Sequence, residues 1–252
     1  MSKTLQGQVA LVTGGSRGLG SAIVTKLASM GADIAFSYVS SDTKAAEVVE
    51  KIEKMGSRVI AIKSDQADPA SAKPLVKRVI DTFGKLDILI NNAAIAVQGQ
   101  TIDDPNLDTE NLDRQWQINV MGTIANTRAA APVLSTGGKI IFIGSLLGTH
   151  VPFSGAADYA GTKAALTAYA KGVARDLGGK NITVNVIQPG VMPTDMAKDV
   201  LGDGVPDQLL DLHPIRRIAT LEEVTSLVGF IASPDAGYMT GGIIDIAGGL
   251  SI

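Results

Sequence analysis

One stretch constrains the fold more than any other: an apolar run followed directly by closely spaced glycines. Residues 9–12 are Val-Ala-Leu-Val, which is typical of a buried parallel strand, and glycines follow at positions 14, 18 and 20. From Leu19 to Met30 the apolar residues recur at helical spacing. A glycine turn between a strand and a helix presents free backbone N–H groups to an anion and lets it approach closely. The stretch therefore predicts a pyrophosphate-binding turn, with an ordinary tight turn as the alternative.

The rest of the chain alternates short apolar runs with longer segments of helical periodicity. Seven runs predict strands, at 9–12, 34–36, 59–62, 88–90, 140–143, 182–187 and 243–246. Helices are predicted after the glycine turn, over 45–55 and 69–83, and from about 109 to 134. Strands separated by helices form a parallel sheet that is covered on both faces. We therefore expect an α/β fold, a doubly wound sheet of about seven parallel strands, in a single domain spanning 1–252.

A stretch dense in proline and glycine interrupts this alternation late in the chain. Residues 189–218 include Pro193, Gly202, Pro206 and Pro214. A long irregular span inside a compact domain is usually functional. We therefore expect a substrate loop at about 190–218.

Composition narrows the range of partners. A net charge of −3 and a pI near 5.4 do not suggest the clustered basic surface that nucleic-acid binding needs. The chain has no cysteine and no apolar run of membrane-spanning length, so we expect a cytoplasmic protein that binds neither nucleic acid nor membrane. His150 and His213 lack the accompanying ligands of a metal site, so no metal is expected.

Candidate catalytic side chains follow the later predicted strands. Ser145 comes just after the strand at 140–143, and Tyr159 and Lys163 lie four residues apart in a helical segment. Side chains at this spacing share a helix face, and an ammonium group beside a phenol lowers the phenol pKa. A nearby serine hydroxyl would hydrogen-bond a carbonyl oxygen as it gains charge. Taken singly, the three residues are better explained as a core tyrosine, a surface lysine and a turn serine, but their joint placement behind the glycine turn favours a catalytic group.

These motifs together resemble the short-chain dehydrogenase/reductase family over essentially the whole chain. Residues 13–20 match its TGxxxGxG turn, and residues 91–94 match its NNAG motif with alanine in the last position. Residues 214–218 and 237–241 are similar to the 3-oxoacyl-acyl-carrier-protein reductase branch. The resemblance implies a Rossmann-type fold and carbonyl chemistry, since enoyl reductases of the family space the tyrosine and lysine more widely. The interval from Ser145 to Tyr159 is slightly longer than is commonest.

The resemblance also implies a role for each site residue. Tyr159 delivers a proton to the substrate oxygen, Ser145 holds that oxygen, and Lys163 lowers the tyrosine pKa and binds the nicotinamide ribose. Asn119 is a poor helix former, expected to bend its helix and to hold a water that connects Lys163 to solvent. Asp65 is expected to bind the adenine amino group, or else it simply starts a loop. The residues expected to bind the cofactor are Gly14, Ser16, Arg17, Gly18, Leu19, Gly20, Tyr38, Ser40, Ser41, Asp65, Gln66, Asn92, Ala93, Ala94, Tyr159, Lys163, Pro189, Gly190 and Thr194.

The end of the second predicted strand bears on the choice of dinucleotide. NAD-selective sites place an acidic residue there to hold the ribose 2′-hydroxyl, whereas this chain has Tyr38. Arg17 in the glycine turn, with the hydroxyls of Ser40 and Ser41, suits a 2′-phosphate. Asp42 would compete, but it stands where the N-cap of the next helix is expected. The sequence favours NADPH over NADH, with Arg17 as an ordinary surface charge as the alternative.

Apolar residues near the catalytic positions suggest a small-molecule carbonyl substrate. The expected pocket walls are Ala96, Leu146, His150, Val151, Phe153, Met192 and Met196. The predicted function is NADPH-dependent reduction of a ketone or 3-oxoacyl-type substrate, with Tyr159 as proton donor. Two alternatives stay open: an NAD(P)-dependent alcohol dehydrogenase that oxidises a small or cyclic alcohol, and a non-catalytic NADP-binding regulator. The family resemblance also implies a homotetramer.

Overall fold

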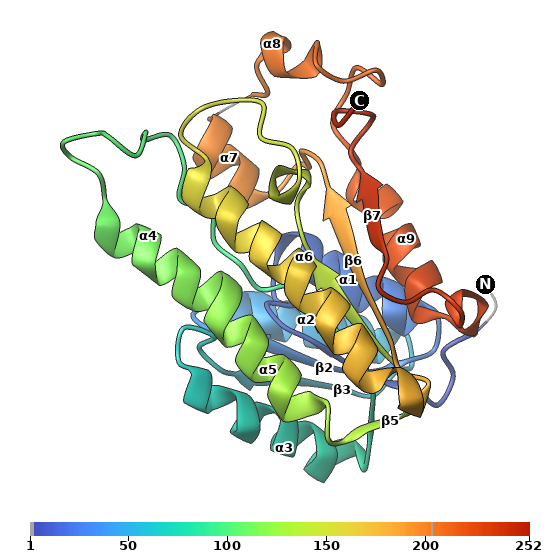
Figure 1. The fold of residues 1–252 in the computed structure, drawn as a ribbon. Helices are drawn as coiled ribbons and strands as arrows, with labels where there is room; N and C mark the ends of the chain where they lie inside the picture. Colours follow the sequence, from blue (N-terminus) through green and yellow to red (C-terminus); the bar gives the residue numbers. More distant parts are fainter. Residues whose placement is uncertain (1–2, 203) are drawn as a thin grey trace.

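A seven-stranded parallel sheet forms the centre of the molecule (Figure 1). The computed structural model describes residues 3–202 and 204–252. The strands lie in the order β3-β2-β1-β4-β5-β6-β7, so the order reverses between β1 and β4. Such a reversal opens a crevice at the carboxyl ends of the two strands, where doubly wound sheets bind their ligands. The strands are β1 (Val9–Val12), β2 (Asp33–Tyr38), β3 (Val59–Lys63), β4 (Leu86–Asn91), β5 (Leu134–Ile143), β6 (Thr183–Pro189) and β7 (Ile243–Ile246).

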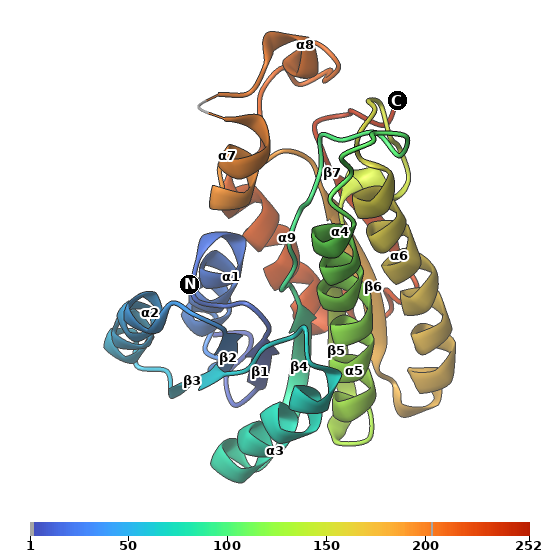
Figure 2. The same cartoon turned by 90° about the vertical axis from the view of Figure 1, so that its left-hand side faces the viewer.

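Helices cover both faces of the sheet, which confirms the expected architecture (Figure 2). Each face has its own buried apolar cluster: Ile23 and Val228 lie in one, and Val79 and Phe142 lie in the other. The first cluster is closed by α1 (Gly18–Ser29), α2 (Asp42–Lys54) and α9 (Leu221–Ala232). The second is closed by α3 (Ala72–Phe83), α5 (Thr123–Ala130) and α6 (Ala157–Leu177). The 3₁₀ turns are Pro69–Ser71, Leu146–Gly148, Gly178–Lys180 and Pro234–Ala236.

The long helical stretch predicted from about 109 to 134 is divided and shorter. A π-helical segment, Gln117–Gly122, separates α4 (Thr109–Trp116) from α5. The bend expected at Asn119 is therefore confirmed, because the wider π turn falls on that residue. The predicted end is wrong: α5 stops at Ala130, and Leu134 already pairs with β4 as the first residue of β5.

The segment predicted as an irregular substrate loop is partly helical. It contains α7 (Asp195–Leu201) and α8 (Asp207–Leu210), while position 203 lies outside the described residues. Thr194 caps α7, since its Oγ1 accepts the Ala197 N–H at 3.2 Å. Helix α7 lies above the start of α1 in Figure 2. The substrate loop thus stands over the glycine turn.

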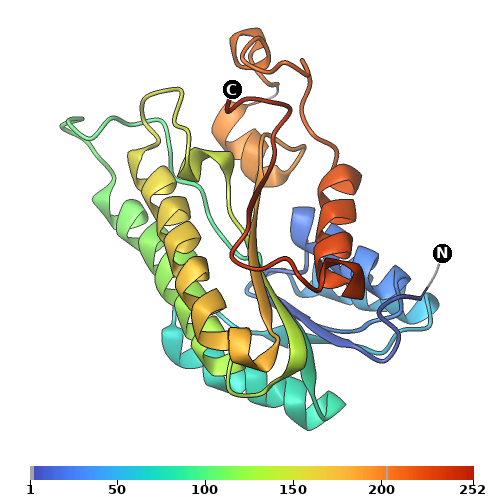
Figure 3. The same ribbon diagram turned by 45° about the vertical axis from the view of Figure 1, so that its right-hand side comes forward.

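The C-terminal strand β7 forms one edge of the sheet, beside β6 (Figure 3). The chain then turns back over the carboxyl ends of the strands. Leu250 and Ala247 pack there against Leu146, the residue that follows Ser145. The C-terminal residues therefore help to position the segment that carries the predicted catalytic serine.

Candidate active site

The glycine turn joins β1 to α1 in a conformation that other residues rarely adopt. Gly14 and Gly18 have φ values of +67° and +52°. A Cβ placed on Gly20 would lie 2.0 Å from the Gly14 carbonyl oxygen, so no side chain fits there. The turn leaves the N-terminus of α1 open to an anion, with the positive end of the helix dipole behind it. This cradle fits the pyrophosphate of a dinucleotide.

Neighbouring strand ends hold the turn in place. Asn92 donates from Nδ2 to the Thr13 carbonyl at 2.8 Å and to the Gly14 carbonyl at 3.2 Å. Thr13 Oγ1 accepts the backbone N–H groups of Asn92 and Ala93, each at 3.0 Å. From β2, Ser37 Oγ accepts the Gly14 N–H at 3.2 Å. The Ser37 contact could not be predicted from the sequence, because it joins strands that only the folded sheet brings together.

The structure brings Ser145, Tyr159 and Lys163 together at the carboxyl end of β5. Tyr159 and Lys163 lie on α6, and the Lys163 Nζ is 5.6 Å from the centroid of the Tyr159 ring. The Ser145 side chain lies near enough to the ring hydroxyl to lower its pKa, and its Oγ accepts the Leu147 N–H at 3.2 Å. Lys163 Nζ donates to the Ile143 carbonyl at 3.1 Å. The predicted placement of the pair on one helix face is therefore present, with both side chains buried.

Burial controls the ionisation of this pair. It raises the pKa of Tyr159 to about 12, and the nearby Ser145 hydroxyl opposes that shift. It also lowers the pKa of Lys163 to about 8. Burial is the larger influence on the pKa of Tyr159, and the lowering of that pKa by Lys163, which the resemblance implies, stays a prediction. Tyr159 is thus held as a protonated phenol, the form that donates a proton.

Asn119 bonds to the chain segment that follows β4. Its Oδ1 accepts the Ile95 N–H at 2.9 Å, and its Nδ2 donates to the Ile95 carbonyl at 2.9 Å. Four residues earlier, Gln115 Oε1 accepts the Val97 N–H at 2.6 Å. These two amides fix the backbone around Ala96, a predicted pocket wall. The water-holding role of Asn119 stays a prediction.

The carboxyl end of β2 differs from expectation at Asp42. The N-cap of α2 is Ser41, so the predicted capping role of Asp42 is wrong. The nearby Asp42 carboxylate raises the pKa of the Tyr38 hydroxyl, and it lies 3.5 Å from Lys63 Nζ. Its position in the first turn still suits the helix dipole. Ser40 lies exposed in the bend that follows Tyr38.

Asp65 and Gln66 follow β3 but have different surroundings. The Asp65 carboxylate is half-exposed, and its Oδ1 accepts the Ala67 N–H at 2.9 Å. The Gln66 side chain is buried and donates to the carbonyls of Ala93 and Ile118, each at 2.9 Å. Its amide is therefore committed to the protein. The Gln66 side chain braces the segment that contains Ala93, and the contact of this residue with the cofactor stays a prediction.

The residues predicted to face the nicotinamide lie at the end of β6. Pro189 is the last residue of that strand, and the Gly190 N–H donates to the Ile246 carbonyl at 3.1 Å. A Cβ on Gly190 would lie 3.0 Å from Ala247 Cα, so the chain passes close to β7 here. Thr194 lies against the glycine turn, 3.8 Å from where a Cβ on Gly18 would be. The segment expected at the nicotinamide and the glycine turn expected at the pyrophosphate thus lie next to each other.

The predicted pocket walls differ in exposure. Leu146 is buried, and Met192 is half-buried against the apolar cluster beneath α1. Val151 and Phe153 are exposed, as is His150. Met196 lies half-buried on α7, and Ala96 is half-buried after β4. The seven side chains therefore come from three segments around the catalytic residues, and their contact with substrate stays a prediction.

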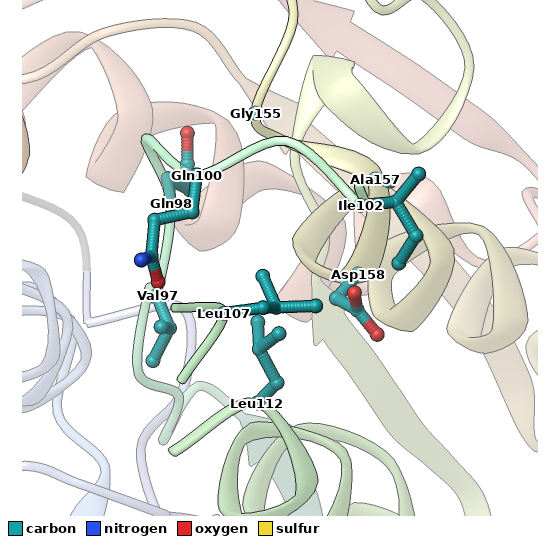
Figure 4. Close-up of a pocket in the computed structure, with 9 residues that line it drawn as sticks. All are labelled: Val97, Gln98, Gln100, Ile102, Leu107, Leu112, Gly155, Ala157 and Asp158. Atoms are coloured by element: carbon teal, nitrogen blue, oxygen red, sulfur yellow. The ribbon is translucent and has the colours of Figure 1, made fainter. Parts of the chain in front are cut away.

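A separate small pocket lies between the β4–α4 loop and the start of α6 (Figure 4). The Gly99 N–H donates to the Gly155 carbonyl at 2.9 Å and ties the two loops together. The pocket residues in Figure 4 do not include any predicted wall or catalytic residue. They are Val97, Gln98, Gln100, Ile102, Leu107, Leu112, Gly155, Ala157 and Asp158.

Over residues 3–202 and 204–252, no group of three or more His, Asp or Glu side chains is arranged to hold a metal ion. None of the helices in those ranges has the length and hydropathy needed to cross a membrane.

A doubly wound sheet with this turn at its reversal point is the architecture of a dinucleotide-dependent oxidoreductase. Residues 14–251 match the family model described as Enoyl-(Acyl carrier protein) reductase. The chain belongs to the short-chain dehydrogenase/reductase family.

Relatives and solved structures agree with this assignment. The 3-oxoacyl-acyl-carrier-protein reductase of Staphylococcus aureus is 36% identical over 96% of this chain and 97% of its own length. The cyclic-di-GMP-binding biofilm dispersal mediator protein of Escherichia coli is also 36% identical, over 96% of both chains. A short-chain dehydrogenase from Burkholderia cenocepacia in complex with NADP is 42% identical, with a TM-score of 0.92 over 99% of this chain and 100% of that one.

Proposed function

We propose that this protein is an NADPH-dependent carbonyl reductase that acts on a ketone or 3-oxoacyl-type substrate. The observation that carries the proposal is a buried Tyr159 close to Lys163 on α6, with Ser145 at the carboxyl end of β5 near enough to influence the Tyr159 pKa. A phenol held in its acid form at the end of a strand is placed to protonate an oxygen that gains negative charge. The Staphylococcus aureus relative, named as a 3-oxoacyl reductase, supports this reaction class.

The residues divide the work between binding and proton transfer. When bound, NADPH supplies the hydride, and the glycine turn from Gly14 to Gly20 would hold its pyrophosphate. Ser145 donates a hydrogen bond to the substrate oxygen, and Tyr159 gives that oxygen its proton as charge develops. The ammonium form of Lys163 stabilises the tyrosinate that results. Asn119 keeps the adjoining backbone in register through its two bonds to Ile95.

Carbonyl reduction is favoured over enoyl reduction by the spacing of the proton donor and its lysine. Tyr159 and Lys163 are four residues apart on α6, whereas enoyl reductases of the family separate the two residues more widely. The same site run in reverse would oxidise an alcohol, so the alcohol dehydrogenase interpretation differs in direction rather than in machinery.

The test is a screen of NADPH oxidation over acetoacetyl thioesters, cyclic ketones, aryl ketones and sugars. We expect steady turnover with at least one of these carbonyl classes. NADPH binding without turnover on any of them would favour the non-catalytic regulator instead. Faster turnover with NADP and the matching alcohols, measured at neutral pH, would favour the dehydrogenase.

We also propose that NADPH is preferred over NADH, because Tyr38 stands where an NAD-selective site would place an acid. The Burkholderia cenocepacia structure with NADP supports this choice. Replacing Tyr38 by Asp should lower the NADPH-to-NADH ratio of kcat/KM at least tenfold, about 1.4 kcal/mol, because a carboxylate repels the 2′-phosphate. Tyr38→Phe is the matched control and should leave the ratio nearly unchanged. A wild-type preference for NADH would contradict the assignment.

Finally, we propose that the chain assembles as a homotetramer. Two groups of apolar side chains are exposed on separate surfaces: Trp116 and Met121 near α4, and Phe230 and Tyr238 near β7. Two separate patches of this kind would allow two different two-fold contacts, which a tetramer of dihedral symmetry uses.

A further inference from the structure

Two basic side chains from different elements face one carboxylate at the entrance to the adenosine side of the cradle. Arg17 Nη1 lies 3.8 Å from Asp195 Oδ2, and Lys44 Nζ lies 3.7 Å from the same oxygen. Arg17 immediately precedes α1, Lys44 is in the first turn of α2, and Asp195 begins α7. One anionic oxygen is thus already held within reach of both cations.

The position of Asp195 is fixed by neighbouring contacts rather than by this ion pair alone. Thr194, the residue before it, lies against Gly18 of the glycine turn and caps α7. Met192 packs against the apolar cluster beneath α1. The base of the substrate loop is therefore held on the cofactor turn, with the carboxylate directed at the two cations.

We propose, on the basis of the proposed NADPH binding, that Lys44 is a second cation for the 2′-phosphate and that Asp195 is its intramolecular competitor. A phosphate oxygen that approaches Arg17 takes the place that Asp195 Oδ2 occupies, because both cations surround that one point. Two anions at this point repel, so the 2′-phosphate displaces the carboxylate. NADH, which lacks the phosphate, leaves the ion pair in place.

In this arrangement, the contacts of α7 with Arg17 and Lys44 depend on which cofactor is bound. Displacing Asp195 frees the first turn of α7 from Arg17 and Lys44, whereas binding of NADH does not. The carboxylate also lowers the net affinity for NADPH, because it must be removed before the phosphate is bound. Half-exposed pairs are individually weak, so the expected effects are several-fold rather than a thousandfold.

Equilibrium binding of NADPH and NADH to the whole protein, at low and moderate salt, tests the proposal. Asp195→Asn should bind NADPH about 3- to 10-fold more tightly, with less than twofold change for NADH. Lys44→Ala should bind NADPH about 5- to 10-fold more weakly, again with little change for NADH. Matched controls on the same helices are Asp199→Asn and Lys51→Ala, both exposed, which should change neither affinity beyond twofold.

Hydrogen exchange on α7 provides a second readout. In the wild type, NADPH should change the exchange of residues 195–201 more than NADH does, and Asp195→Asn should remove that difference. Unchanged or weakened NADPH binding by Asp195→Asn, or equal shifts for both cofactors, would overturn the proposal. These measurements need no substrate, so they stand even where the carbonyl screen fails. A wild type that does not bind NADPH contradicts the proposed function itself.

Discussion

At the scale of single residues, the site depends on side chains whose ionisation is set by burial. Tyr159 and Lys163 are both buried on α6, and burial opposes the charged form of each. The phenol is consequently kept protonated, while the pKa of the Lys163 amine is brought close to neutral pH. Burying ionisable groups in this way costs stability and is typical of functional sites.

The buried lysine should make stability depend on pH. With a pKa of about 8 in the folded chain against 10.5 when exposed, Lys163 binds fewer protons folded than unfolded between these values. The free energy of unfolding therefore rises with pH across this window, and the cost of the buried charge is fully present below pH 8. Relative to Lys163→Met, the wild type should gain about 2 kcal/mol between pH 7 and pH 9.5.

Urea unfolding at the two pH values measures this difference. Lys171→Met, an exposed position on the same helix, is the control and should keep the wild-type pH dependence. Equal pH dependence in the wild type and Lys163→Met would show that Lys163 is not desolvated in the folded chain.

At the scale of elements, the π-helical segment connects Asn119 to the loop that follows β3. Gly122 closes this segment against the loop after β3, where a Cβ would lie 2.0 Å from the Gln66 carbonyl oxygen. Gln66 in turn donates to the Ile118 and Ala93 carbonyls. The helix that carries Asn119 and the segment after β4 are therefore braced by the same side chain.

A glycine-to-alanine pair separates packing from helix propensity. Gly122→Ala should destabilise the protein by about 2–3 kcal/mol, because the methyl group overlaps backbone atoms that cannot move freely. Gly172→Ala on α6, where a Cβ meets no atom within 4 Å, should stabilise it by about 0.5–1 kcal/mol. Urea denaturation of both variants measures the contrast, and similar effects at the two sites would contradict the close contact with Gln66.

The elements were largely predictable because their signals are local. Each of the seven strands overlaps a predicted apolar run, so its place followed from the sequence, although five strands extend beyond the runs: β2, β3, β4, β5 and β6. The end of α5 was missed because an alanine-rich segment favours helix, whereas pairing with β4 decides that Leu134 is in a strand. The N-cap of α2 was predicted one residue too late, at Asp42 instead of Ser41, since both are good capping residues.

Contacts between distant segments could not be predicted in this way. Gln66 looked like a cofactor residue by its place after β3, and only the fold shows its amide bonded to Ala93 and Ile118. Lys44 and Asp195 carried no signal, because each is an ordinary charge until α7 is placed over α1 and α2. The motif residues of the site could be predicted from the sequence, because their spacing resembles that of the family.

At the scale of the whole molecule, the predicted site residues lie together at the carboxyl ends of the strands. The glycine turn, the Asn92 brace, Ser145 and Gly190 all follow carboxyl ends of strands in one sheet. The substrate loop with α7 and α8 stands above them. The exposed apolar side chains proposed to contact other copies come from α4, the π-helical segment, α9 and the segment before β7: they are Trp116, Met121, Phe230 and Tyr238.

Light scattering after size exclusion should give the mass of four chains, about 104 kDa from 26.0 kDa each. Phe230→Glu should reduce the mass to that of a dimer or monomer, because burying a carboxylate in an apolar contact is costly. Lys180→Glu, which changes an exposed charge in the 3₁₀ turn after α6, is the control and should leave the mass unchanged. A wild-type monomer would contradict the proposed assembly.

The central claim is that Tyr159 protonates the substrate oxygen during NADPH-dependent reduction. The most direct measurement compares kcat of the wild type and Tyr159→Phe on the best carbonyl substrate, together with the NADPH affinity of each. The phenyl ring keeps the packing on α6 but removes the proton donor, so kcat should fall about 10²–10⁴-fold while NADPH affinity changes less than about threefold. Turnover above about a hundredth of the wild type, with NADPH still bound, would contradict the account.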